Sequence, residues 1–123
     1  MKVIINTSSM IPIYEQIADR IKALIRDGEL KENDGLPSVR ALSKELRISA
    51  LTVKKAYDAL EEEGFTVTVH GKGTYVAAVN PEVLLEEQKK ELEADLTKAV
   101  ARGRQCRISD EDMKEMFELI LEG

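Results

Sequence analysis

The sequence is poor in the residue types that form disulfides, metal clusters and aromatic cores. Its 123 residues include one cysteine, one histidine, no tryptophan, two phenylalanines and three tyrosines. A single cysteine cannot form an internal disulfide, and one histidine beside it supplies too few ligands for a zinc site. We therefore expect no metal or other cofactor. The core should be packed mainly from aliphatic side chains, because 43% of the residues are hydrophobic and few of them are aromatic.

Long hydrophobic runs are also absent. Apolar stretches such as Val3–Ile5 are far shorter than the roughly 20 residues that a membrane-spanning helix needs. No basic segment followed by an apolar one stands at the start of the chain, as a secretory leader would require. These absences predict a cytoplasmic protein with no membrane partner.

The residue sets that carry catalysis are missing as well. Neighbouring carboxylates occur in runs such as Glu61–Glu63 and Glu86–Glu87, which are typical of the solvated face of a helix. No Ser-His-Asp or Cys-His set is placed for a cleft. The segment His70–Gly73 is rich in glycine, but no helix is expected after it, as a phosphate-binding nucleotide loop would require. The sequence therefore does not predict an enzyme.

Charge is abundant and unevenly distributed. The chain has 18 basic and 23 acidic side chains, which gives a net charge of −5. Residues 1–79 carry 11 of each sign, whereas residues 80–123 carry 7 basic and 12 acidic side chains. Within the first part, residues 40–57 have a net charge of +4. Because the composition changes at Asn80–Pro81, we predict two domains, 1–79 and 80–123, and a basic surface on the first.

Three amphipathic helices are predicted in residues 1–79. The first begins at Pro12 and ends at Asp27–Gly28. Ser38 is placed to cap a second, short helix, and Ser49 to cap a third that ends at Gly64. The short connection between the last two is typical of a helix-turn-helix. The residues expected to face the core are Ile13, Ile17, Ile21, Leu24, Ile25, Val39, Leu42, Leu46, Val53, Ala56, Tyr57 and Leu60.

A β-hairpin is predicted after the third helix. Residues 65–69 alternate apolar and polar side chains at period two, His70–Gly73 forms a turn, and residues 74–77 return as a second strand. A hairpin directly after a helix-turn-helix forms a wing. At the start of the chain, Val3–Ile5 is expected to be a short strand or a packed arm. The predicted fold is mainly α with a small β-hairpin: a winged helix-turn-helix domain followed by a two-helix dimerisation tail.

The tail is predicted to form two amphipathic helices. The first runs from about Glu82 until Gly103, and Ser109 with Asp112 resembles a capping box for the second. Two such helices cannot bury both apolar stripes on themselves, so the stripes need the winged domain or another copy of the chain. We expect a homodimer, with contacts from Leu85, Leu92, Leu96, Val100, Met113, Met116, Phe117 and Ile120.

The second and third helices and the wing carry the candidate DNA contacts. A helix fits the major groove of DNA, and side chains near its N-terminus reach phosphates and base edges. If they do not contact DNA, Lys54 and Lys55 are a solvated pair of lysines, and Arg40 forms a salt bridge with a nearby glutamate. We favour DNA contacts for Lys54 and Arg40 and leave Lys55 open. The wing tip suits a narrow minor groove. The full predicted set is Ser38, Arg40, Ser49, Leu51, Thr52, Lys54, Lys55, His70, Gly71 and Lys72.

Five short motifs resemble the GntR family of bacterial transcription regulators. They lie in unbroken order over about residues 10 to 79, and they are Pro12–Ile17, Leu36–Arg40, Thr52–Tyr57, Leu60–Gly64 and Gly71–Val76. The short two-helix tail resembles the YtrA subfamily, whose tails dimerise and which often regulates transporter operons. The resemblance implies that Arg40, Ser49, Thr52 and Lys54, with His70 and Gly71 at the wing, match the DNA-contacting positions of the family.

The chain departs from the family pattern at two places. The usual Gly-Asp before Leu36–Pro37 is Asp34–Gly35, a small change in the turn that we do not expect to alter function. After Ser49 the family usually has polar residues, whereas this chain has Ala50 and Leu51. Either Leu51 meets a thymine methyl group, or it packs inward and specificity rests on Arg40 and Lys54. We favour the thymine contact.

These observations lead to one main hypothesis and one alternative. The main hypothesis is a homodimeric regulator that binds a palindromic operator in double-stranded DNA and represses a transporter or neighbouring operon. The alternative is a winged-helix module that binds a protein partner and does not read DNA; the apolar pair Ala50–Leu51 favours it. The sequence points to no small-molecule effector.

Overall fold

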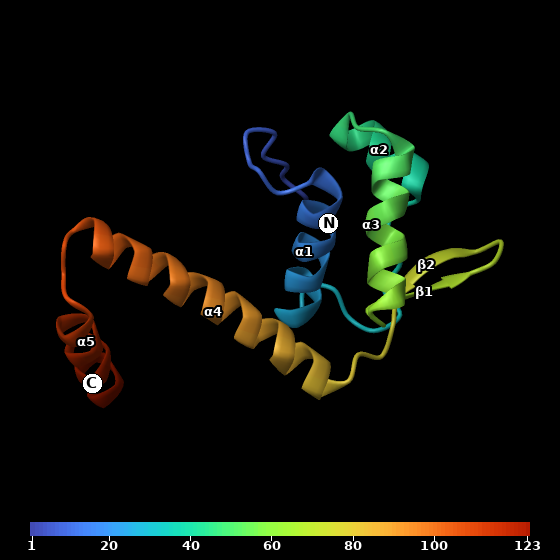
Figure 1. The fold of residues 1–123 in the computed structure, drawn as a ribbon. Coiled ribbons are helices and arrows are strands. Elements are labelled where there is room, and N and C mark those ends of the chain that lie inside the picture. The colour runs from blue at the N-terminus through green and yellow to red at the C-terminus, as the bar shows by residue number, and fades with distance from the viewer. The chain divides into compact units, whose positions relative to one another are not determined.

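The computed structural model describes residues 1–123 as two compact units, Met1–Asn80 and Pro81–Gly123. The first unit holds three helices and a two-stranded antiparallel sheet, and the second holds two helices (Figure 1). The prediction of a mainly α fold with one small β-hairpin is therefore confirmed. No helix is both long enough and apolar enough to cross a membrane.

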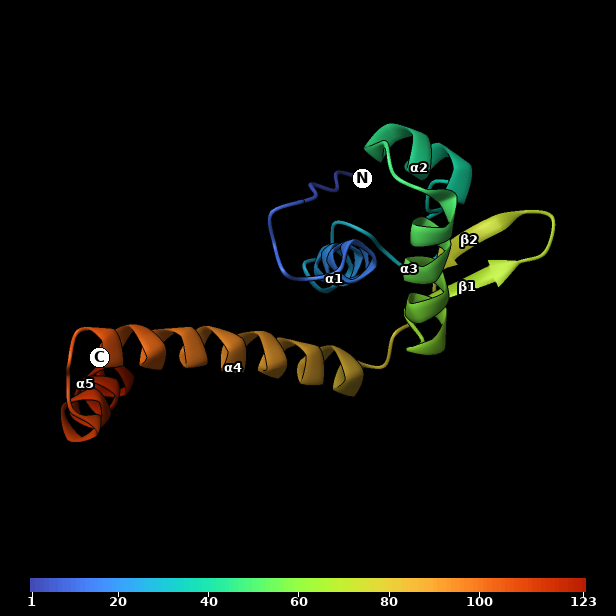
Figure 2. The same ribbon diagram turned by 45° about the horizontal axis from the view of Figure 1, so that its top comes forward.

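The core of the first unit forms around α3. Helices α1 (Ile13–Arg26) and α2 (Val39–Leu46) both pack on α3 (Ala50–Glu62), as does the first strand. Figure 2, which views α1 nearly end-on, shows α3 between α1 and the hairpin. Most residues predicted to face inward are buried, while Ile13, Val39 and Leu46, at helix ends, are half-buried. The buried apolar residues are Val3, Ile17, Ala18, Ile21, Leu24, Ile25, Leu42, Val53, Ala56, Tyr57, Leu60, Phe65 and Val76.

The N-terminal segment is a packed arm and not a strand. Residues 1–6 have no regular secondary structure, yet Val3 is buried. Arg20 Nε donates a hydrogen bond to the Lys2 carbonyl oxygen at 3.2 Å, which fixes the arm to α1. Gln16 forms a second attachment, because its amide donates to the Asn6 carbonyl oxygen at 3.0 Å and accepts from the Asn6 N–H at 2.9 Å.

The hairpin consists of β1 (Thr66–Val69) and β2 (Gly73–Val76), paired from Thr66 with Val76 to Val69 with Gly73. Period-two burial, expected from the sequence, is not observed in β1. Phe65 and Thr66 are both buried, whereas Val67 and Val69 are exposed. The hairpin contacts α3 through β1 and then extends away from that helix (Figure 1), so α3 does not cover the exposed valines.

The second unit consists of α4 (Pro81–Gln105) and α5 (Asp110–Glu122). Ser109 caps α5 as predicted, since its Oγ accepts from the Asp112 N–H at 3.1 Å. The prediction that Gly103 ends α4 is wrong: the helix continues to Gln105, and the left-handed residue that follows is Arg107, with φ 60°. Gly103 allows close packing instead, because a Cβ atom there would collide with Met113 Sδ of α5.

Candidate nucleic-acid interface

Two capped helices and a tight turn build the helix-turn-helix. Ser38 Oγ accepts from the Ala41 N–H at 3.0 Å at the start of α2, and Ser49 Oγ accepts from the Thr52 N–H at 3.1 Å at the start of α3. Between them Arg47 adopts a left-handed conformation with φ 57°. The Ile48 N–H then donates to the Ser43 carbonyl oxygen at 3.0 Å, which closes the end of α2. Local capping chemistry therefore sets where the second helix of the pair begins.

Tyr57 anchors the inner face of α3. Its ring is buried in the core, and its hydroxyl donates to the Pro37 carbonyl oxygen at 2.7 Å, just before α2. Burial raises the pKa of Tyr57 to about 12, so the hydroxyl remains a donor at neutral pH. This bond ties α3 to the segment that leads into α2.

The outer face of α3 combines an apolar and a charged side chain in its first two turns. Leu51 is 79% exposed, which excludes the alternative in which it packs inward. Lys54 Nζ forms an ion pair with Asp58 Oδ2 at 2.8 Å, and the hydrogen bond between them raises the pKa of Lys54. Both partners remain about 60% exposed, so the ammonium group is still accessible to a phosphate.

The hydroxyl groups predicted to contact DNA are joined to each other. Ser49 Oγ and Thr52 Oγ1 are 2.8 Å apart, in addition to the capping bond at Ser49. Ser49 is exposed and Thr52 is half-buried. Both groups therefore already have a hydrogen-bond partner within the chain.

One contact at this surface was not predicted from the sequence. The Lys55 ammonium lies over the Tyr14 ring of α1, 4.1 Å from its centroid. This is a cation–π contact between residues 41 positions apart, so no local pattern indicates it. The hydroxyl of Tyr14 donates to Glu15 Oε1 at 3.2 Å, and this hydrogen bond raises the pKa of Tyr14.

Arg40 differs from Lys54 and Lys55 because its guanidinium has neither an acidic nor an aromatic partner within the chain. It is exposed in the first turn of α2, and its guanidinium forms no ion pair, although a glutamate partner was the alternative to DNA binding. Lys44 is exposed on the same short helix, and Arg47 is exposed in the turn that follows it. An unpaired guanidinium can form two parallel hydrogen bonds to a phosphate or a guanine edge.

The wing tip presents the remaining predicted residues. His70, Gly71 and Lys72 are exposed at the end of the hairpin, which projects away from α3 (Figure 1). Gly71 has φ 77°, a conformation that favours glycine, and the Lys72 N–H donates to the Val69 carbonyl oxygen at 2.9 Å to close the turn. No interaction joins the wing tip to the helix pair, so the structure does not bring these two groups of residues together.

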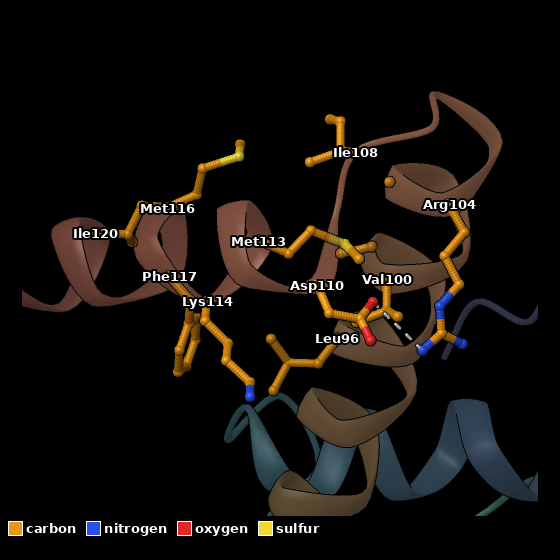
Figure 3. A pocket seen from close by; sticks show the side chains of 12 residues that line it. Leu96, Val100, Arg104, Ile108, Asp110, Met113, Lys114, Met116, Phe117 and Ile120 are labelled. Atoms are coloured by element: carbon orange, nitrogen blue, oxygen red, sulfur yellow. Dashed lines mark ion pairs between the residues drawn. The ribbon is translucent and has the colours of Figure 1, made fainter.

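The second unit contains an apolar groove of about 580 Å³ between α4 and α5. Leu96 and Val100 of α4 face Met113 and Phe117 of α5 across it (Figure 3). Arg104 Nη2 and Asp110 Oδ1 form an ion pair at 3.8 Å at its edge. The groove is lined by Leu96, Ala99, Val100, Gly103, Arg104, Ile108, Asp110, Met113, Lys114, Met116, Phe117 and Ile120.

Comparisons with known proteins agree with this geometry. Residues 13–76 match the family described as bacterial regulatory proteins, gntR family. The chain is 34% identical over 116 residues to the HTH-type transcriptional repressor YtrA of Bacillus subtilis (strain 168). The aligned region covers 94% of this chain and 89% of that protein. Both the winged domain and the tail lie within this match.

Solved structures give the same result. A transcriptional regulator from Oenococcus oeni superposes with a TM-score of 0.72 at 33% identity, over 95% of this chain and 97% of that one. The DNA-binding domain of AraR in complex with operator ORX1 superposes with a TM-score of 0.56 at 28% identity, over 63% of this chain and 96% of that one. The alternative of a module that does not read DNA is therefore set aside. The chain belongs to the GntR family of bacterial regulatory proteins, as a DNA-binding regulator of transcription with a YtrA-like tail and not as an enzyme.

Proposed function

We propose that the chain acts as a homodimeric repressor, in which two copies join through their C-terminal helices and bind a palindromic operator with their winged domains. The observation that carries the dimer is the apolar surface of the second unit. Neither α4 nor α5 buries a single residue within the chain. Of the predicted dimer contacts, Met113 is half-buried, and Leu85, Leu92, Leu96, Val100, Met116, Phe117 and Ile120 are exposed.

A second copy of the chain is the occupant that fits this surface best. Contiguous apolar patches of this kind are rare on monomers and mark interaction sites. In a two-fold dimer the same surface of both copies meets, so the stripe on one chain covers the stripe on the other. The groove between α4 and α5 also leaves space for side chains from a partner helix.

The two-fold symmetry of the proposed dimer implies a palindromic operator. Two identical winged domains read two identical half-sites, and helix-turn-helix dimers place them about 34 Å apart on one face of the DNA. The distribution of charge also supports DNA binding by the winged domain and dimerisation by the tail. Residues 80–123 hold 7 basic and 12 acidic side chains, so phosphate groups repel this unit, whereas residues 40–57 attract them.

The proposed DNA contacts fall into two groups. On the helix pair they are Ser38, Arg40, Ser49, Leu51, Thr52, Lys54 and Lys55, and on the wing they are His70, Gly71 and Lys72. All of them except the half-buried Thr52 are exposed, which a role in DNA contact requires. The repressor function is supported by the similarity to a relative named as a transcriptional repressor. The target is proposed to be a transporter operon or another operon beside the gene of this protein, as the resemblance to the YtrA subfamily implies.

A fluorescence-anisotropy titration tests the operator. The full chain is titrated against labelled DNA from upstream of its own gene and against a scrambled duplex of equal length, at several salt concentrations. We expect tighter binding to the upstream duplex and a steep loss of affinity with salt, because bound phosphates release counterions. Equal binding to both duplexes would contradict a specific operator. A transcription reporter fused to the same region should fall in output when the protein is supplied; a rise would mean activation.

A pair of matched substitutions tests the dimer. Leu96→Glu places a carboxylate in the apolar stripe, whereas Ala94→Glu adds the same charge to an exposed position about half a turn away on the same helix. Burying an unpaired charge costs several kcal/mol, so Leu96→Glu should yield monomers in sedimentation velocity at concentrations where Ala94→Glu remains dimeric. If Leu96→Glu stays dimeric, the tail does not hold the copies together.

A further inference from the structure

In the first two turns of α3 the polar side chains already have partners within the chain, whereas a DNA-reading helix usually presents free polar side chains to the bases. Each polar side chain there has a partner within the chain: Ser49 with Thr52, Lys54 with Asp58, and Lys55 with Tyr14. The side chains without a partner are Ala50 and Leu51, and both are exposed. The groups most available to an incoming ligand on this helix are therefore apolar.

Leu51 is the larger of the two and points away from the core. It is 79% exposed, and at about 100° per residue it lies roughly opposite the buried stripe that includes Val53, Ala56 and Leu60. Lys54 and Lys55 follow it by three and four residues, so they lie beside it on the same surface. An apolar side chain flanked by two ammonium groups matches a polyanion that carries a local apolar group.

In the major groove that apolar group is the 5-methyl of thymine. The other features of the base edges there are hydrogen-bond donors and acceptors, which Leu51 cannot satisfy. We propose that Leu51 is a specificity-determining residue that selects a thymine in each half-site by contact with its 5-methyl group. The two lysines bind the flanking phosphates and hold Leu51 against the base edge. This inference rests on the proposed operator binding and adds to it the base that α3 selects.

Replacement of thymine by deoxyuridine tests the contact directly, because deoxyuridine lacks only the 5-methyl group. The full chain first selects a tight-binding duplex from a randomised pool. That duplex is then resynthesised with symmetry-related thymines replaced by deoxyuridine, one pair at a time. One pair should weaken binding roughly fifteenfold, since loss of one buried methyl group lowers affinity about fourfold in each half-site. All other pairs should leave the affinity nearly unchanged.

Two variants assign the effect to Leu51. Leu51→Ala should bind the thymine and deoxyuridine duplexes equally, whereas Leu51→Met, which keeps a long apolar side chain, should still prefer thymine. Because Leu51 is exposed, both variants should unfold at the temperature of the parent chain. The inference is overturned if no thymine pair responds to the replacement, or if Leu51→Ala retains the preference. Failure to select any specific duplex would instead overturn operator binding itself.

Discussion

The two units of the chain treat their apolar side chains in opposite ways. All thirteen buried apolar residues belong to Met1–Asn80, where three helices and the base of a hairpin close around them. In Pro81–Gly123 no helical residue is buried, and several large apolar side chains are exposed, among them Ile120 at 72% and Leu92 at 59%. The first unit is therefore a complete fold, whereas the second leaves its apolar surface uncovered, as the proposed dimer requires.

The difference arises from geometry more than from composition. In the first unit α3 is covered by α1, α2 and β1, so its apolar stripe has neighbours on every inward side. In the second unit the two helices meet beside the turn, where Gly103 admits Met113, and they enclose an open groove beyond it. An amphipathic helix pair that diverges in this way needs additional apolar surface to be stable in water.

The largest expected effect lies in the closed unit. Leu60→Ala removes a side chain with no exposed surface, and the resulting cavity should lower the free energy of unfolding by about 2–5 kcal/mol. Urea denaturation followed by circular dichroism measures this change. The loss should be the same at every protein concentration, because Leu60 packs within one chain.

The corresponding truncation in the tail serves as the contrast. Leu96→Ala should hardly change the midpoint of urea denaturation at concentrations where the parent chain is already monomeric. It should lower the midpoint increasingly as the concentration rises, because only the dimer is stabilised by Leu96. If its effect were independent of concentration, the two units would not differ in the way described above.

Much of the closed unit was predictable because local chemistry determines it. Three serines were expected to cap helices, and Ser38, Ser49 and Ser109 all accept the predicted kind of backbone hydrogen bond. The apolar spacing likewise predicts all four buried residues of α3 and four of the five in α1, where Ala18 is buried as well and Ile13, in the first turn, is half-buried. Such features depend on neighbours within one or two helical turns, which the sequence displays directly.

Features that depend on distant neighbours were not predictable. Gly103 looks like a helix terminator in the sequence, and its actual role depends on Met113 ten residues later. Period two in residues 65–69 predicts a buried face, but nothing in the sequence says how far α3 extends over the hairpin. The Tyr14–Lys55 contact likewise requires the packing of α1 on α3. The roles of individual residues in DNA binding remain predictions for the same reason, since they depend on a partner outside the chain.

The second largest effect concerns the exposed cations of the closed unit. Arg40→Ala should weaken operator binding by about 1–3 kcal/mol, because the Arg40 guanidinium can bind DNA without giving up a contact within the chain. The dimer should not change. Lys54→Ala should cost less, since Lys54 must share its ammonium with Asp58. Anisotropy titrations of both variants, with sedimentation velocity as the control, give the comparison. Equal, unchanged affinities would mean that this surface does not face DNA.

A third effect, of about 1 kcal/mol, tests how firmly α3 is anchored in the closed unit. Tyr57→Phe removes the hydrogen bond to the Pro37 carbonyl oxygen. The parent chain should also have a pH dependence that this variant lacks. The folded-state pKa of about 12 lies above the ordinary value of 10.0, so the contribution of Tyr57 is complete below pH 10 and is lost as the pH rises toward 12. Urea denaturation at pH 9 and pH 11 should therefore show a smaller decrease in stability for Tyr57→Phe than for the parent.

The smallest expected effect separates the role of the Tyr14 ring from that of its hydroxyl, at the edge of the proposed DNA-contacting surface. Tyr14→Leu removes the ring that holds the Lys55 ammonium, whereas Tyr14→Phe keeps it, so operator affinity should fall by about 0.5–1 kcal/mol in the first variant and hardly at all in the second. The same Tyr14→Leu change made in a Lys55→Ala background should have no further effect, because the cation is already gone. An additive loss would mean that Tyr14 acts on DNA independently of Lys55. A loss of stability without a loss of affinity would mean that the contact belongs to the fold of the closed unit alone.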